Sequence, residues 1–409
     1  MTGSSGSGVP WRDLVPTALV PNVLQGCGQG AAIPVIPLAA VALTGSPATA
    51  AMVAAMLTVG QVLFALPAGW LVGRFGERST MLVSTAATGL GGLLAHLASS
   101  VVLLGCGALL IGSGVAVFAT ARHAWITAVI PAGVRGRSLS ALAGATRLGM
   151  FAGPFLAAAA FHLTGDARGG FLAVVAMSVL LVVVIASVRF DGLAGAAAPA
   201  GIAAGDEPSP KVFRTMWQRR DVLLTLGLTV SVVTTMRITR RILVPLAGVA
   251  VGMDDVTVTL VVGIASGIDF SVFYLGGVVA DRWGRLAVAV PALVAFGLSH
   301  VALALATQLS AGQWWFLSGT LVMALANGWS GGVVATIGSD LADPRAPAPF
   351  LSSWRLTTDL GSSVAPVAVA ALAAAFSLSV ACVAFGIVAW VAATILPSRV
   401  RRFLPDSGG

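Results

Sequence analysis

Charged side chains inside long apolar stretches are the residues of this chain whose chemistry most needs an explanation. Seven of them are our candidates: Arg147, Arg237, Arg240, Arg241, Asp269, Arg355 and Asp359. A charge near the middle of a bilayer costs about 3 kcal/mol or more, so each should face protein, water or a partner. Arginine does not release its proton in a protein, so Asp269 and Asp359 are the only candidates among the seven for carrying a proton.

Arg237, Arg240 and Arg241 are spaced at i, i+3 and i+4, which places them within an arc of about 100° on one helix. Because each buried charge needs a partner, the three arginines are candidates for a functional site. The alternative is that Arg240 and Arg241 extend to the outer membrane interface, as long basic side chains do. The five arginines and two aspartates of this set leave a charge of +3, which favours an anionic group on the substrate.

Neutral polar and aromatic residues extend the candidate binding site. Gln25, Gln29 and Asn327 are placed to supply hydrogen bonds, and Trp329 and Trp354 to stack against a ligand. All five are equally compatible with packing inside a helical bundle.

The composition places these residues in a membrane. Hydrophobic residues make up 57% of the 409 residues and charged residues only 9%, and the mean hydropathy is +0.96. Stretches of roughly 20 apolar residues recur throughout, which is the length of a membrane-spanning helix. The predicted spans are 14–44, 47–72, 80–99, 101–128, 138–163, 169–189, 221–250, 256–280, 286–308, 314–340, 348–375 and 377–397.

The chain contains a repeat with a spacing of 208 residues. The segment Gly277-Val-Val-Ala-Asp281-Arg282-Trp-Gly284-Arg285 has a degenerate copy in Gly69-Trp-Leu-Val-Gly73-Arg74-Phe-Gly76-Glu77-Arg78. A Pro-Leu-Ala triplet lies 32 residues before each copy, at Pro37 and Pro245. The repeat predicts an all-α polytopic membrane protein of two pseudo-symmetric halves, each with six helices. The predicted divisions are a tail (1–13), a first half (14–189), a linker (190–220), a second half (221–397) and a tail (398–409).

The loops predict the orientation. With the N-terminus inside, sixteen basic residues fall in cytosolic segments and only Arg168 in an outer loop, so the positive-inside rule places both termini in the cytosol. The pI near 11 therefore reports orientation and implies no nucleic-acid partner. The basic end of the linker, 211–220, is interpreted either as a short amphipathic helix on the membrane surface or as a disordered tether.

These residues resemble the major facilitator superfamily. The loop motif of that family is matched by Gly277, Asp281, Arg282, Gly284 and Arg285. The first copy keeps Gly69, Arg74, Gly76 and Arg78 but has Gly73 in the acidic position and Glu77 in a basic one. The resemblance implies a twelve-helix transporter in which this loop is a conformational latch, and the departures assign the latch chiefly to Asp281.

A second resemblance is to the 12-helix drug:proton antiporter group. It rests on Gly149-Met-Phe-Ala-Gly153-Pro154, and it departs from the motif of that group at Ala157 and Ala158. Small residues let helices approach closely, which suits either a sliding contact between halves or ordinary bundle packing.

The resemblance also implies pairs across the two halves. Gly361 corresponds to Gly149 at an offset of 212, which sets Asp359 against Arg147. In this fold that arrangement predicts Arg147 near Asp269, and Gln61 near Asp359. A simpler interpretation pairs Asp359 with Arg355, one turn earlier on the same helix.

Several functions are excluded or disfavoured. No phosphate-binding loop, zinc-protease motif or nucleophile elbow is present, so we expect neither an enzyme nor a cofactor. Cys27, Cys106 and Cys382 lack ligand spacing and read as small core residues, without a metal. Twenty-two arginines against one lysine suggest a bacterial source, hence the cytoplasmic (inner) membrane.

We therefore predict a monomeric secondary transporter, most simply a proton-coupled exporter of small amphipathic molecules working by alternating access. The alternative is an importer or exchanger of an organic anion bound by Arg237 and its neighbours. A lesser alternative is a membrane receptor of the same fold that transports nothing.

Overall fold

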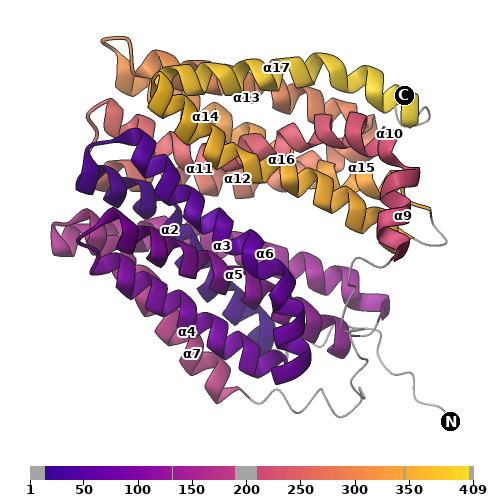
Figure 1. Ribbon diagram of the computed structural model, residues 1–409, viewed down its shortest axis with the longest axis horizontal. Coiled ribbons are helices and arrows are strands. Elements are labelled where there is room, and N and C mark those ends of the chain that lie inside the picture. Colours follow the sequence, from indigo (N-terminus) through magenta and orange to yellow (C-terminus); the bar gives the residue numbers. More distant parts are fainter. Residues whose placement is uncertain (1–13, 131, 189–209, 344–346, 405–409) are drawn as a thin grey trace. The chain divides into compact units, whose positions relative to one another are not determined.

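The computed structural model describes residues 14–130, 132–188, 210–343 and 347–404, and these form helices joined by short turns (Figure 1). The predicted tail 1–13, most of the linker and the last five residues lie outside this part of the chain. In chain order the helices are η1 (Val15–Leu19), α2 (Val20–Thr44), α3 (Pro47–Phe75), α4 (Glu77–His96), α5 (Val101–Val129), α6 (Ala132–Thr164), η2 (Ala167–Gly170), α7 (Phe171–Ser187), α9 (Pro210–Gln218), α10 (Arg220–Val222), η3 (Leu223–Gly227), α11 (Leu228–Ala250), α12 (Asp255–Trp283), α13 (Leu286–Ala306), α14 (Gly312–Trp329), α15 (Val333–Leu341), α16 (Pro347–Ala375) and α17 (Leu378–Phe403).

Each of the twelve predicted spans coincides with a long helical segment of the described residues. Eleven of these segments are long and apolar enough to cross a membrane. The twelfth, α4, is 20 residues long but carries Ser, Thr and Gly on its buried face, which lowers its hydropathy. The protein is thus an all-helical, multi-pass membrane protein.

The chain divides into two compact units. Unit 1 comprises residues 1–35 and 56–206, and unit 2 comprises residues 36–55 and 207–409. One boundary, after residue 206, falls inside the predicted linker 190–220, and residues 36–55 of the predicted first half are grouped with unit 2. The six-helix halves themselves remain a prediction.

The same helix pairs pack inside each unit. In unit 1, α4 packs against α5 and α7; in unit 2, α13 packs against α14 and α17 (Figure 1). These are the third, fourth and sixth predicted spans of each half, so the internal repeat extends from the loop motif to the helix packing.

The repeat extends to the backbone at the start of each unit. Both η1 and η3 are single π-helical turns, and each begins 208 residues from its counterpart, at Val15 and Leu223. In both, the residue after the turn donates its amide to the carbonyl five residues earlier, to Val15 and to Leu223. A π-turn inserts an extra residue into a helix and often occurs at functional sites.

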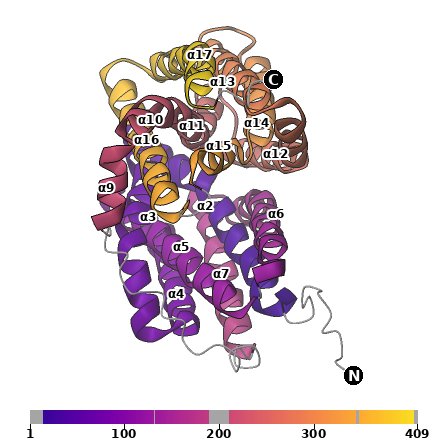
Figure 2. The same cartoon turned by 90° about the vertical axis from the view of Figure 1, so that its right-hand side faces the viewer.

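The end of the linker is helical, so the disordered-tether interpretation is wrong. Helix α9 packs against α16 within unit 2 (Figure 2), and the Arg220 guanidinium lies 4.7 Å from the centre of the Trp217 ring. Contact with the membrane surface remains a prediction. Cys27 and Cys382 are buried as expected, but Cys106 is exposed.

Candidate transport site

An ion pair inside unit 2 forms the centre of the candidate site. Arg240 on α11 places Nη1 3.4 Å from Oδ2 of Asp269 on α12, and the two side chains are only 12% and 15% exposed. Arg240 belongs to the helix face that we predicted for Arg237, Arg240 and Arg241, and on this face it contacts Asp269. Arg240 therefore has a buried partner and does not need the membrane interface to satisfy its charge.

Asn327 on α14 makes a second contact with the aspartate. Its Nδ2 donates to the same Oδ2 of Asp269. A close approach of α14 to α12 makes this contact possible: a Cβ built on Gly328 would lie 2.5 Å from the Asp269 carbonyl oxygen, and one on Gly276 would lie 2.0 Å from the Trp329 carbonyl oxygen. Glycines at these two positions thus bring the amide to the carboxylate.

Arg237 forms a hydrogen bond with the backbone at a break in the tenth predicted span. Helix α14 ends at Trp329 and α15 begins at Val333, with Gly332 at φ 84° in the left-handed region. Nη2 of Arg237 donates to the Ser330 carbonyl oxygen at 2.6 Å and lies 3.1 Å from its Oγ. The C-terminal end of a helix carries partial negative charge, so this arginine stabilises the exposed end of α14.

Arg241 contrasts with its two neighbours. It is half-buried, and it forms no hydrogen bond or ion pair with any residue the structure describes. Three arginines and one aspartate leave a charge of +2 in this cluster. Part of the excess positive charge in the apolar stretches therefore lies in this one cluster of unit 2.

The other predicted pair lies on one helix. Arg355 Nε is 3.5 Å from Asp359 Oδ2 on α16, in the local i, i+4 arrangement. Both side chains are largely exposed, 85% and 59%, so the pair contributes little stability. The predicted pairs of Arg147 with Asp269 and of Gln61 with Asp359 join the two units and remain predictions.

The two tryptophans differ in burial. Trp354 is 3% exposed, its Nε1 donates to the Val334 carbonyl oxygen, and its ring packs on Gly338. Its indole therefore joins α15 to α16 in the core of unit 2, and stacking of a ligand on this ring remains a prediction. Trp329 is half-buried at the end of α14, next to the helix break, and its buried Nε1 has no described acceptor.

The candidate residues of unit 1 lie on α2 and α6. Gln25 is buried, whereas Gln29 and Arg147 are half-buried. The glycine-rich motif of α6 packs against α2, because a Cβ on Gly149 would lie 2.2 Å from the Val23 carbonyl oxygen and one on Gly153 2.3 Å from that of Cys27. These glycines therefore serve helix packing within unit 1.

The two copies of the loop motif share an unusual backbone. Gly76 has φ 77° and ψ 165°, and Gly284 has φ 82° and ψ 168°, a region that only glycine occupies readily. This explains the second glycine of the motif. The first glycine, Gly69 or Gly277, has no atom within 4 Å of a built Cβ, and nothing in the structure explains it.

The second copy forms a charge network with α15. Arg285 contacts Asp340 on α15 (Nε to Oδ2, 2.9 Å) and Asp281 (Nη1 to Oδ1, 3.2 Å). The hydrogen bond with Asp340 raises the pKa of Arg285 above its usual value. In the first copy, Arg78 donates to the Ala186 carbonyl oxygen. Asp340 was not predicted; its place at the end of the broken tenth span is the only signal in the sequence.

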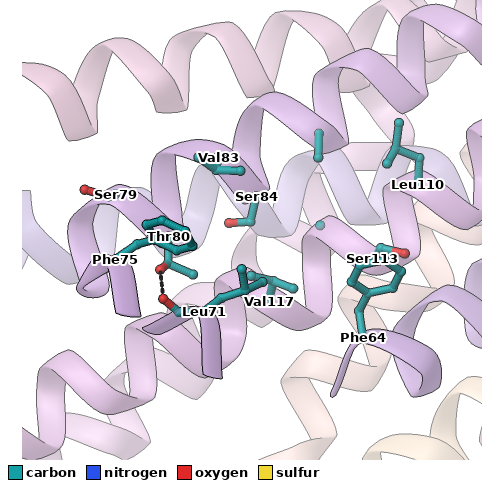
Figure 3. Close-up of a pocket in the computed structure, with 12 residues that line it drawn as sticks. Phe64, Leu71, Phe75, Ser79, Thr80, Val83, Ser84, Leu110, Ser113 and Val117 are labelled. Carbon is teal, nitrogen blue, oxygen red and sulfur yellow. Dashed lines mark hydrogen bonds between the residues drawn. The ribbon is translucent and has the colours of Figure 1, made fainter. Parts of the chain in front are cut away.

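Unit 1 also contains an apolar pocket between α3, α4 and α5, with a volume of about 300 Å³ (Figure 3). Hydroxyl groups line it, but they bond to backbone carbonyls, as Thr80 does to Leu71 and Gly76, and Ser84 to Met81. The lining that remains is hydrocarbon, contributed by residues such as Phe64, Phe75 and Val117.

The comparisons agree with this arrangement. The sequence profile described as Major Facilitator Superfamily matches residues 22–346. The chain therefore belongs to the Major Facilitator Superfamily, a family of transporters rather than enzymes. No curated protein matches the chain.

Solved structures share the fold at low sequence identity. The nucleoside transporter NupG is similar with a TM-score of 0.74 at 11% identity, over 94% of this chain and 98% of that one. A bacterial homologue of the human lysosomal transporter Spinster, inward-facing and unoccupied, gives 0.72 at 16% identity over 100% of both chains. The D-xylose-proton symporter gives 0.69 at 16% identity, over 97% and 98%.

Proposed function

We propose that this secondary transporter couples proton movement to the export of small amphipathic molecules, with Asp269 as the proton-binding group. The observation that carries the proposal is the buried contact of one carboxylate oxygen of Asp269 with both Arg240 and Asn327. Protonation removes the negative charge that holds Arg240, so α11 and α12 lose their ion pair. A group of this kind biases a two-state machine by its protonation.

The direction and the substrate class have weaker support. Export is supported by the resemblance of Gly149 to Pro154 to the motif of drug:proton antiporters. An amphipathic substrate is supported by the apolar pocket of unit 1, whose volume is at the lower end of the range for small-molecule sites.

The test uses the full chain in proteoliposomes. Asp269→Asn keeps the hydrogen-bonding shape of the side chain but cannot ionise, and we expect it to lose substrate accumulation driven by a pH gradient. Exchange of labelled for unlabelled substrate without a gradient should continue, because it needs no net proton movement. Asp359→Asn, which removes an acid from the exposed pair on α16, is the matched control. If Asp269→Asn retained gradient-driven accumulation, Asp269 would not be the coupling group.

A second candidate, exchange of an organic anion, is favoured by the unpaired charge of Arg241 beside the Arg240–Asp269 pair. An anion at this cluster would balance its charge of +2 in part. We expect Arg241→Gln to weaken anion transport at least tenfold and to leave transport of neutral compounds unchanged, measured by uptake of matched anionic and neutral solutes. Equal loss for both kinds of solute would eliminate this candidate.

A further inference from the structure

Arg122 of unit 1 is a half-buried arginine inside a membrane-spanning helix, α5, without a carboxylate partner in the described part of the chain. Its Nη1 donates to Oδ1 of Asn22 on α2, which is neutral. The two acidic residues of unit 1 that the structure describes do not contact it: Asp166 pairs with Arg168, and Glu77 is in the first turn of α4. The positive charge of Arg122 is therefore solvated by dipoles alone.

Unused hydrogen-bond donors surround this charge. Nδ2 of Asn22, Nε2 of Gln25 and Nε of Arg122 are all buried, and none has an acceptor in the described residues. Asn22 is 0% exposed and Gln25 7%. The orientation of the Asn22 amide is fixed, because its oxygen accepts from Arg122 and its nitrogen must then face elsewhere.

The neighbouring histidine does not supply the missing acceptor. Nδ1 of His123 lies 3.2 Å from Nη2 of Arg122 and 2.8 Å from the Ala119 carbonyl oxygen. A ring nitrogen either carries a proton, and donates to the carbonyl, or lacks one, and accepts from the arginine. It therefore serves at most one of these contacts, and donors at the cluster still outnumber acceptors.

We propose that Asn22, Gln25 and Arg122 form a binding site in unit 1 for a small molecule with a carboxylate or phosphate group. Asn22 and Gln25 are one turn apart on α2 and so share a face, and Arg122 contacts the first of them. An oxyanion has several acceptor lone pairs and a negative charge, which matches both the unused donors and the uncompensated charge. A water molecule would satisfy some donors but would leave the charge unbalanced.

The site is separate from the Arg240–Asp269 cluster, and the proposal does not depend on proton coupling by Asp269. The experiment below measures ligand binding alone. The binding proposal can therefore fail while the transport mechanism stands, and the transport mechanism can fail while the binding proposal stands.

The test is thermal unfolding of the full chain in detergent, titrated with benzoate or, at matched ionic strength, with the neutral isostere benzamide. Ligand that binds the folded state raises the unfolding midpoint. We expect a rise with benzoate and none with benzamide. Inorganic phosphate is the second probe, and a response to phosphate alone would assign the site to that group.

Asn22→Asp is the decisive variant. The new side chain has the same shape as asparagine, and its carboxylate would pair with Arg122 in place of a bound anion. We expect a higher midpoint without ligand and at least a tenfold loss of apparent benzoate affinity. Arg122→Gln should lose the response as well; if it does not fold, Asn22→Asp decides. Arg168→Gln, which removes an arginine already paired with an acid, and Asp269→Asn should both keep the response.

The proposal is overturned if neither anion stabilises the wild-type chain. It is equally overturned if Asn22→Asp binds the anion as well as wild type does.

Discussion

One carboxylate oxygen of Asp269 accepts from two donors, so the charge of this aspartate affects contacts among three helices. Arg240 approaches from α11 and Asn327 from α14, while the aspartate itself is on α12. Because the pair is 12% and 15% exposed, water compensates little when one partner is lost. Removal of one member of a buried pair leaves an uncompensated charge, which typically costs about 3–5 kcal/mol.

A double-mutant cycle tests this coupling. We expect Arg240→Gln to lower the unfolding midpoint more than the double variant Arg240→Gln/Asp269→Asn, because the double variant leaves no buried charge unpaired. The measurement is thermal unfolding of all four proteins at neutral pH. Arg355→Gln, in the largely exposed pair, serves as the control and should change the midpoint little. Additive effects of the two substitutions at 240 and 269 would show that these side chains do not interact.

At the scale of helices, glycine sets the distances on which the site depends. Gly328 and Gly276 allow α14 to lie against α12, and Gly332, at φ 84°, ends the segment in which α14 gives way to α15. Arg237 then binds the carbonyl that the break exposes. Broken helices with half-helix ends at a binding site are a recurrent feature of secondary transporters, and here the break and the ion pair are linked by Arg237 and Arg240 on one helix, α11.

Substitution of Gly328 by alanine tests the close approach. Its Cβ would lie 2.5 Å from a backbone oxygen of α12, so we expect α14 to shift, the Asn327–Asp269 contact to weaken and the unfolding midpoint to fall. Gly144→Ala is the control: its Cβ would meet no atom within 4 Å. Alanine favours a helix over glycine by about 1 kcal/mol, so this control should be neutral or stabilising. A rise in midpoint for both variants would contradict the packing argument.

At the scale of the whole molecule, two units with the same internal packing differ in their charges. Unit 2 holds the Arg240–Asp269 pair and the Arg285–Asp340 network, whereas the described part of unit 1 has Arg122 without a carboxylate. The repeat thus preserves helix packing and the π-turns at η1 and η3, and it does not preserve Asp269, which corresponds to Gln61 at the offset of 208. We infer that proton coupling belongs to unit 2 and that unit 1 contributes to ligand binding.

The orientation of the whole chain is a further prediction, from the sixteen-to-one distribution of basic residues. We expect a single cysteine at Asp254, in a chain without its three native cysteines, to react with a membrane-impermeant thiol reagent added to intact cells. A cysteine at Arg219 should react only after the membrane is opened. Labelling in the reverse pattern would mean that both termini are outside.

Much of this protein was predictable from its sequence. Apolar length alone identified twelve helices, because a backbone in lipid must satisfy its own hydrogen bonds and therefore spans as a helix of about 20 residues. The repeat at 208 residues predicted two related halves, and the spacing of Arg237, Arg240 and Arg241 identified one helix face. These features depend on local periodicity, which a sequence records directly.

Which residues of different helices meet was decided only by the tertiary structure. The contact of Asn327 with Asp269 depends on helix approach at Gly328, and that of Asp340 with Arg285 on where a broken helix ends. The burial of Trp354 and the donors around Arg122 follow from side-chain packing between helices distant in the chain. The sequence determined the helices and their charges, because these follow from local composition. Their partners depended on distances between helices, which no local pattern contains.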